Sequence, residues 1–209
     1  MLKLELVEAV LARALKGGAD FAEVYAQRAK KRRMKVRQGA LEEALSGLDY
    51  GAGVRLFFGT EVVYAYTNDL TQEGLMEALE TLLRAKGALG KVDEGGKGGL
   101  DFRKATPKGL HAPKVPYGEK DKRYRLERLL EAEAGARIAP AIKQVEASLL
   151  EWEEEVLVAN PEGVFAEEKR VRTRLFVLAV AQDGAEVQTG YSAPGKSVGL
   201  ELFDLYPPK

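Results

Sequence analysis

The sequence contains no cysteine and a single histidine, His111, among its 209 residues. The lack of cysteine excludes disulfide bonds, thiolate metal ligands and a cysteine nucleophile within these residues. His111 has no second histidine or carboxylate close in sequence, so it falls short of a metal-binding motif. A histidine-dependent triad would rest on this one residue, and no nucleophile-elbow motif accompanies it. We therefore expect His111 to be exposed or locally bonded.

Long apolar runs and an excess of either charge are also lacking. No run approaches the ~20 apolar residues that cross a membrane, and the N-terminus, with Glu5 and Glu8, does not read as a signal peptide. The 32 basic and 32 acidic residues cancel, which argues against a basic protein that coats nucleic acid. We expect a cytoplasmic protein without a membrane segment. Its 31% charged residues suit a thermophile-like surface rich in ion pairs.

Residues 1–90 read as an α+β unit in which two helices flank three or four antiparallel strands. Residues 3–16 place apolar side chains at helical spacing, and Gly17-Gly18 provides a natural end. A turn is expected at Gln38-Gly39, and a hairpin link at 58–61. Alternating apolar and polar residues predict short strands at 21–27, 33–37, 41–45, 51–58 and 62–67.

The second helix of this unit has marked ends in the sequence. Thr71 is placed to cap it by accepting a hydrogen bond from a first-turn N–H group. Leu70 and Leu75 occupy the two positions of a hydrophobic staple. Gly87 is expected to end the helix, and its leucines, at positions 75, 79, 82 and 83, are expected to face the sheet.

Residues 91–118 form a glycine- and proline-rich connector, and residues 119–209 form a second α+β unit. This unit begins with a helix from 121 to 134, whereas residues 141–150 fit helix and strand spacing equally. Beyond a turn at 160–163, strands at 170–181 and 187–191 are joined by a hairpin turn at Asp183-Gly184. The predicted fold class is therefore α+β, with two units of mainly antiparallel sheet packed with a few helices.

The segment Arg28–Arg37, RAKKRRMKVR, has seven basic residues in ten. One hypothesis is a surface that binds nucleic acid or another polyanion. The alternative, which we favour, is a charged edge strand that resists aggregation. No aromatic residue is interleaved to stack on bases, and Glu42 and Glu43 follow closely enough to pair with the basic residues across a hairpin.

An acidic run, formed by Glu151, Glu153, Glu154 and Glu155, surrounds Trp152. Paired carboxylates could perform acid–base chemistry or bind a hard cation. The alternation of a strand would split them between two faces, however. We therefore favour a solvated face.

Several segments resemble the TldD/PmbA family in the family's own order. They are GADFAEVY at 18–25, GAGVR at 51–55, YAYTNDL at 64–70 and TQE at 71–73. Residues 158–190 resemble the middle region of that family. The GAGVR and AYTND segments are more similar to the TldD branch than to the PmbA (TldE) branch.

The resemblance implies a cytoplasmic, zinc-dependent peptidase system, also called a modulator of DNA gyrase. In it a TldD-like subunit pairs with a PmbA-like one and cuts unfolded peptides in an enclosed cavity. The family's metal motif, H-E-x-x-x-H, lies C-terminal to the region matched here, and this sequence lacks it. We therefore assign no catalytic residue and no metal ligand, and expect zinc only in a C-terminal part that is not present.

The favoured hypothesis is the N-terminal, non-catalytic portion of a TldD-like zinc metallopeptidase, inactive by itself, that contributes cavity wall and binds peptide and a homologous subunit. One alternative is a stand-alone interaction module or a non-catalytic PmbA/TldE-like partner subunit. Polyanion binding through Arg28–Arg37 is a weaker alternative. The candidate substrate-binding residues are Arg55, Tyr66, Asn68 and Asp69. Their alternative roles are solvent contact for Arg55, packing for Tyr66, and turn or cap chemistry for Asn68 and Asp69.

Overall fold

The computed structural model describes residues 1–88, 103–105 and 112–208. Within these ranges the chain is α+β, with helices packed on a mainly antiparallel sheet, so the predicted fold class is confirmed. Most of the predicted connector, including His111, lies outside the described residues. No helix in the described part is long and apolar enough to cross a membrane.

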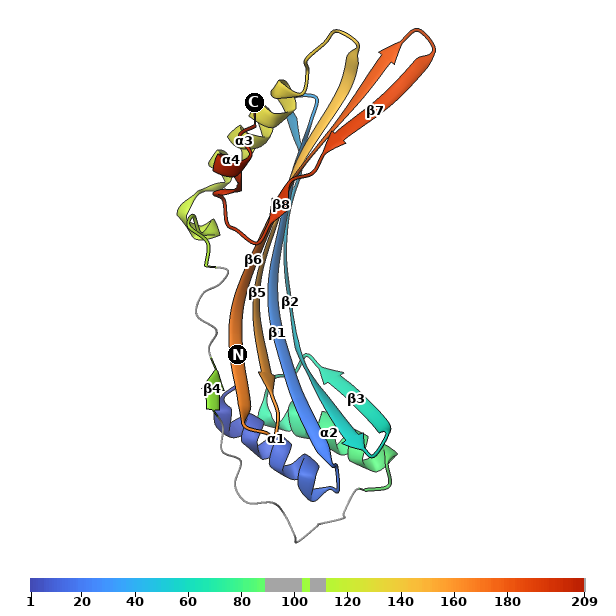
Figure 1. Ribbon diagram of the computed structural model, residues 1–209, viewed down its shortest axis with the longest axis vertical. Helices are drawn as coiled ribbons and strands as arrows, with labels where there is room; N and C mark the ends of the chain where they lie inside the picture. Colours follow the sequence, from blue (N-terminus) through green and yellow to red (C-terminus); the bar gives the residue numbers. More distant parts are fainter. Residues whose placement is uncertain (89–102, 106–111, 209) are drawn as a thin grey trace. The chain divides into compact units, whose positions relative to one another are not determined.

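Four long strands form the centre of the sheet (Figure 1). The strands pair in the order β3-β2-β1-β5-β6-β4, and β7 and β8 also pair with β6. The long strands are β1 (Phe21–Arg37), β2 (Ala40–Phe58), β5 (Ile142–Ala159) and β6 (Val164–Asp183).

Two pairs of predicted strands prove to be continuous. The segments 21–27 and 33–37 both belong to β1, and 41–45 and 51–58 both belong to β2. Charged or exposed residues interrupt the apolar alternation, but the backbone ladder does not depend on side-chain polarity. Residues 142–150, which fitted two spacings, are strand.

Residue contacts divide the chain into two compact units. Unit 1 comprises residues 1–29, 49–108 and 155–168, and unit 2 comprises residues 30–48, 109–154 and 169–209. Each of the four long strands therefore contributes residues to both units. The boundaries predicted along the sequence, 1–90, 91–118 and 119–209, stay a prediction.

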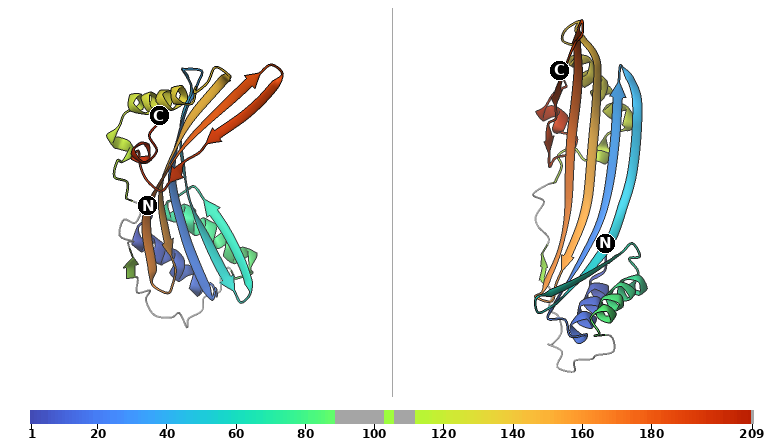
Figure 2. Two further views of the ribbon diagram at one scale, coloured as in Figure 1. Left: turned by 45° about the horizontal axis from the view of Figure 1, so that its top comes forward. Right: turned by 90° about the vertical axis from the view of Figure 1, so that its right-hand side faces the viewer.

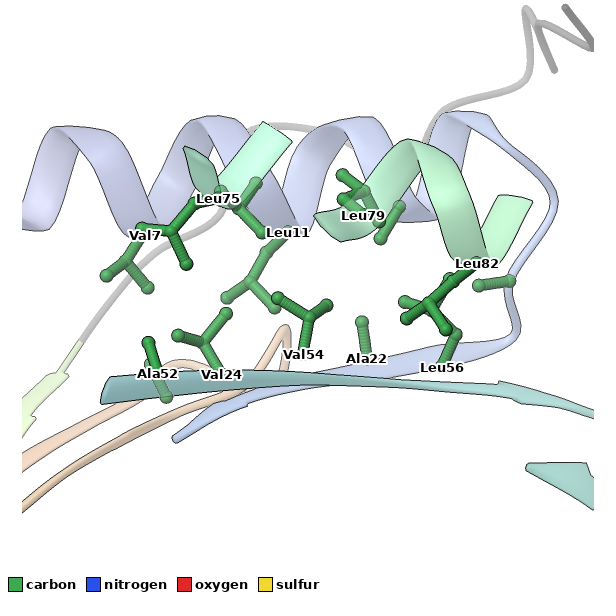
Figure 3. Packing of buried hydrophobic residues seen from close by; sticks show 14 of the residues in the cluster. Val7, Leu11, Ala22, Val24, Ala52, Val54, Leu56, Leu75, Leu79 and Leu82 are labelled. Carbon is green, nitrogen blue, oxygen red and sulfur yellow. The ribbon is translucent and has the colours of Figure 1, made fainter. Parts of the chain in front are cut away.

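In unit 1, α1 (Leu4–Lys16) and α2 (Gln72–Ala85) pack on one face of the strands. Figure 3 shows valine and leucine side chains of both helices meeting those of β1 and β2. β3 (Glu61–Thr67) is antiparallel to β2, and β4 (Arg103–Ala105) is parallel to residues 164–166 of β6. In this unit alternate residues along β1 and β2 are buried, and these residues form the part of the core that the two strands contribute.

The predicted helix ends of unit 1 are confirmed. Gly17 caps α1, and Gly18 follows with a φ of 86°. Thr71 Oγ1 accepts a hydrogen bond from Gly74 N at 3.2 Å, which satisfies one free N–H group of the first turn of α2. Gly87, with a φ of 64°, follows the last turn of α2.

Unit 2 contains α3 (Lys122–Gly135), α4 (Leu202–Leu205) and a 3-10 turn, η1 (Tyr117–Glu119). Its core joins apolar residues of these elements to β1, β5 and β6, and Tyr124 meets Phe203 edge-to-face at 6.2 Å. The short strands are β7 (Glu186–Ser192) and β8 (Gly195–Lys196).

The β6–β7 hairpin, orange to red in Figure 2, turns one residue later than predicted. Asp183 pairs with Glu186, so the two turn residues are Gly184 and Ala185 rather than Asp183 and Gly184. Gly184 has a φ of 56°. Two-residue hairpin turns require a positive φ at the first turn position, where glycine has no steric cost.

The expectation that Arg28–Arg37 forms an edge strand is wrong. This segment belongs to β1, which lies between β2 and β5 in the sheet. The predicted pairing with Glu42 and Glu43 is confirmed, at 2.7 Å from Lys35 Nζ and 3.3 Å from Arg33 Nε. Arg37 also contacts Glu146 of β5 at 2.8 Å. Glutamates on the neighbouring strands thus balance much of the basic run.

The expectation of a solvated acidic face at 151–155 is wrong for two of its members. Glu151 is 2% exposed and Glu154 is 6% exposed. Glu151 bonds to Arg125 of α3, which is itself buried. A buried carboxylate needs such a partner because burial without one is costly. The helix that supplies the partner is 26 residues away in sequence.

Candidate functional site: a tyrosine face and the free edge of strand β3

The candidate site lies on the face of the unit 1 sheet that α1 and α2 leave uncovered. Ala52, Val54 and Leu56 of β2 are buried in the helix-facing core. The residues between them therefore point to the opposite face, because successive side chains of a strand alternate. This face carries three exposed tyrosines, at 25 (40%), 64 (54%) and 66 (74%). We call it the tyrosine face.

A shallow depression of about 220 Å³ opens on the tyrosine face. Its lining includes these three tyrosines and, besides them, Gln27, Asp49, Tyr50 and Asn68. Two of the predicted substrate-binding residues, Tyr66 and Asn68, are therefore brought together here. The lining offers flat aromatic surface, neutral hydrogen-bonding groups and the carboxylate of Asp49, which suit an amphipathic ligand.

The glycines of the GAGVR segment make room for this surface. A Cβ atom at Gly53 would lie 2.4 Å from the Tyr64 hydroxyl oxygen and 2.6 Å from its ring. Tyr64 therefore lies directly over the backbone of Gly53. A Cβ atom at Gly51 would lie 3.0 Å from Asn68 Oδ1. Both glycines allow a close approach of a side chain from the neighbouring strand.

Arg55 lies beside the tyrosines rather than in the depression. It is paired in register with Tyr64, and its guanidinium carbon lies 5.9 Å from the centre of that ring. Arg55 Nη1 also lies 3.3 Å from Glu23 Oε2 on β1. Its charge is thus balanced within the same face, and its alkyl chain adds to the apolar surface.

Asp69 serves the turn that leads into α2. Its backbone N–H donates to Thr67 Oγ1 at 3.0 Å, and its Oδ1 accepts from the backbone N–H of Thr71 at 2.9 Å. Hydrogen bonding to Thr71 lowers the pKa of Asp69 below its ordinary value. This is the turn chemistry expected as the alternative role of Asp69, and a substrate role for this residue stays a prediction.

The second feature of the site is the free edge of β3. β3 is the first strand of the sheet that the structure describes, and it pairs with β2 from Ala52↔Thr67 to Phe58↔Glu61. In the described part of the chain no other strand pairs with it. Every second backbone N–H and C=O group of an edge strand faces outward and can pair with another chain. Tyr64 and Tyr66 stand along this edge.

Tyr25, Tyr50 and Tyr64 are not among the residues predicted for this site from the sequence. Tyr64 and Tyr66 are two residues apart on a predicted strand, so the sequence alone indicates that both lie on one face of the sheet. Tyr25 and Tyr50 come from β1 and β2, and only the order β3-β2-β1 in the sheet brings them to the lining of one depression.

No group of three or more histidine, aspartate, glutamate or cysteine side chains within residues 1–88, 103–105 and 112–208 could hold a metal ion. The described residues thus do not fit a zinc site. This face offers backbone hydrogen-bonding groups along β3 and aromatic surface.

Comparisons with known proteins agree with this fold. Residues 22–86 match domain 1 of the PmbA/TldA metallopeptidases, and residues 113–207 match their central domain. Among curated proteins, the chain is 25% identical over 186 residues to the metalloprotease TldD homolog of Haemophilus influenzae. It has the same identity, also over 186 residues, to a metalloprotease of Methanothermobacter thermautotrophicus. Each match covers 88% of this chain but only 38% and 39% of the relative.

Solved structures show the same fold at lower identity. A putative modulator of a DNA gyrase from Thermotoga maritima superposes with a TM-score of 0.70 at 15% identity, over 93% of this chain and 43% of that one. TldE from Thermococcus kodakarensis superposes with a TM-score of 0.65 at 16% identity, over 92% and 43%. Because the two domain matches together span most of the sequence, the chain belongs to the TldD/PmbA metallopeptidase family, of which it covers the first and central domains.

Proposed function

We propose that this chain is the non-catalytic, peptide-holding portion of a TldD-like zinc metallopeptidase. An extended, unfolded peptide pairs with the free edge of β3 and rests its side chains on the tyrosine face. The observation that carries the proposal is the coincidence of the unpaired edge with Tyr64 and Tyr66. The relatives' name, metalloprotease, supports the wider activity.

The physical basis is recognition without sequence selectivity. Main-chain hydrogen bonds to an added strand form with almost any peptide, because every residue except proline carries the same N–H and C=O groups. Tyrosine rings then cover the peptide's apolar side chains while their hydroxyl groups stay in water. A surface of this kind favours unfolded chains, whose backbone groups are free, over folded ones.

We assign no hydrolytic step to these residues. Hydrolysis in the proposed enzyme depends on zinc bound outside the matched region, where the metal would activate a water molecule. The role of this chain is to wall the cavity and present an extended peptide. The proposal includes a cytoplasmic location and a dimer with a homologous TldD- or PmbA-type subunit.

The test is peptide binding by the 209-residue chain. Fluorescence anisotropy of a labelled, unstructured peptide of about ten residues should show saturable binding that Tyr66→Lys weakens by about tenfold or more. A lysine adds charge and removes aromatic area at the edge. Tyr191→Lys is the matched control, since Tyr191 is 75% exposed on β7 and Tyr66 is 74% exposed on β3. Equal losses in both variants would contradict a site at β3.

A PmbA/TldE-like, non-catalytic partner subunit is the second candidate. The similarity to TldE from Thermococcus kodakarensis favours it. Light scattering of the chain mixed with a zinc-containing TldD-type subunit distinguishes this partner role from the peptide-holding role proposed above. A stable complex in which peptidase activity and zinc belong wholly to the other subunit supports the partner role. Polyanion binding is not proposed, because glutamates on β2 and β5 balance Arg32, Lys35 and Arg37.

A further inference from the structure

We infer that unit 2 carries a second binding site, a cationic pocket for a carboxylate attached to an apolar group. The pocket has a volume of about 490 Å³, within the range of small-molecule sites. It is lined by β1, β2, β5 and the start of α3, and every lining residue belongs to unit 2. It is thus separate from the tyrosine face, and the inference does not depend on the proposed function.

The inner wall of the pocket is mostly apolar, beside the buried Arg125–Glu151 pair. Met34, Tyr117 and Leu149 line it and are 8%, 5% and 1% exposed. Leu45, on β2, lines it as well and is 62% exposed. Burial raises the pKa of Tyr117 to about 12, so its hydroxyl group is neutral at pH 7. Water in contact with such a wall is displaced favourably by an apolar group.

The charged groups of the lining are mostly positive. They comprise two carboxylates, Asp121 and Glu151, and six cations: Lys30, Arg32, Arg33, Lys120, Lys122 and Arg125. Three of the cations are matched by acidic residues. Arg125 and Arg32 share Glu151, at 3.2 Å and 3.4 Å, and Arg33 lies 3.3 Å from Glu43. Arg32 Nη1 also lies 3.7 Å from Glu153 Oε2, so each of the three arginines has a carboxylate to balance it.

The three lysines of the lining have no acidic partner among the described residues. Lys120 Nζ lies 5.3 Å from the centre of the Tyr124 ring, and Lys30 and Lys122 make no ion pair in this part of the chain. Asp121, whose Oδ1 accepts the α3 capping bond from Tyr124 N at 2.8 Å, supplies one negative charge against these three positive ones. The lining thus offers unmatched ammonium groups next to an apolar wall.

This combination selects the ligand class. An inorganic anion would satisfy the lysines but leave the apolar wall in water, whereas a neutral apolar molecule would leave the lysines unmatched. A carboxylate on an apolar body satisfies both, with charge-assisted hydrogen bonds at one end and desolvation at the other. The C-terminal residue of a peptide and a free aliphatic acid share this chemistry.

Calorimetric titration of the 209-residue chain with N-acetyl-leucine tests the inference, with N-acetyl-leucinamide as the uncharged analogue. We expect the acid to bind at least about tenfold more tightly than the amide, the size of one charge-assisted hydrogen bond. Octanoate represents a free aliphatic acid, and N-acetyl-leucine represents the C-terminal residue of a peptide. The acid that binds more tightly indicates which of these two ligands the pocket prefers. Equal binding of acid and amide, no binding of either acid, or binding of inorganic phosphate as tight as the acids would overturn the inference.

Substitution of the lysines locates the site. The double variant Lys120→Gln, Lys122→Gln should weaken binding of the acid by about tenfold or more while the amide is unaffected. Lys16→Gln, on the exposed end of α1 in unit 1, is the matched control and should leave affinity unchanged. An unchanged affinity in the double variant, with an unchanged thermal midpoint confirming that it folds, would also overturn the inference.

Discussion

Arg125 of α3 and Glu151 of β5 form a buried ion pair, with Arg125 Nη2 at 3.2 Å from Glu151 Oε2. Arg125 also donates to the backbone carbonyl oxygens of Tyr117, at 2.7 Å, and Asp121, at 3.0 Å. One guanidinium group therefore connects η1, the N-terminus of α3 and the sheet. It holds the wall of the cationic pocket in place.

Breaking this pair from one side should be costly. We expect Glu151→Leu to lower the free energy of unfolding by about 3–5 kcal/mol, because Arg125 is left buried without its counter-charge. The double variant Arg125→Met, Glu151→Leu should lose less than the sum of the two single variants. Urea unfolding of the four proteins measures this coupling. Strict additivity would show that the two residues do not act as a pair.

The contact between Gly53 and Tyr64 predicts a second outcome. Gly53→Ala should lower the free energy of unfolding by about 1–3 kcal/mol, since the added methyl group meets the Tyr64 ring. Gly47→Ala, on the same strand with no atom near its Cβ position, should change stability by less than about 0.5 kcal/mol. Adding Tyr64→Ala to Gly53→Ala should recover part of the loss. Equal effects at Gly53 and Gly47 would contradict the close approach.

The α2 cap offers a prediction with a control in the same helix. Thr71→Ala removes the acceptor for Gly74 N and should cost about 1 kcal/mol. Thr81→Ala removes a hydroxyl group that bonds to the Glu77 carbonyl at 2.9 Å, which the helix does not need. We expect it to change stability by less than about 0.5 kcal/mol. Thermal unfolding of both variants is the measurement, and a larger loss for Thr81→Ala would refute the assignment.

The environment of Glu201 leads us to expect that the stability of unit 2 depends on pH. Burial raises the pKa of this carboxyl group, but hydrogen bonds from the backbone N–H groups of Lys114 and Val115, both 2.9 Å, lead a larger opposite effect. The pKa of Glu201 in the folded protein is therefore below the ordinary value of a glutamate. A carboxylate of this kind stabilises the fold fully above its unfolded pKa, and the contribution is lost as pH falls through the folded pKa.

Glu201→Gln should accordingly be less stable than the original protein by about 2 kcal/mol at pH 7. The difference should shrink as the pH falls from about 5 toward 3, because the wild-type carboxylate then binds a proton. Urea unfolding of both proteins across this range gives the two stability curves. A difference that stays constant with pH would exclude a charged Glu201 as its cause.

Local signals were enough to locate the three long helices, the N-cap of α2 and most turns. Thr71, Asp121 and Gly18 act within one turn of the chain, so their neighbours in sequence are also their partners in space. The order of matched segments likewise identified the family, and β-alternation marked the buried face of β1 and β2.

Long-range pairing could not be read in the same way. The central position of β1, the burial of Glu151 and the meeting of Tyr25, Tyr50 and Tyr66 all depend on which strands lie side by side. Alternation gives the face on which a side chain lies but not the strand beside it. A charge run therefore looked like an exposed edge, although glutamates on both neighbouring strands balance it in the interior of the sheet.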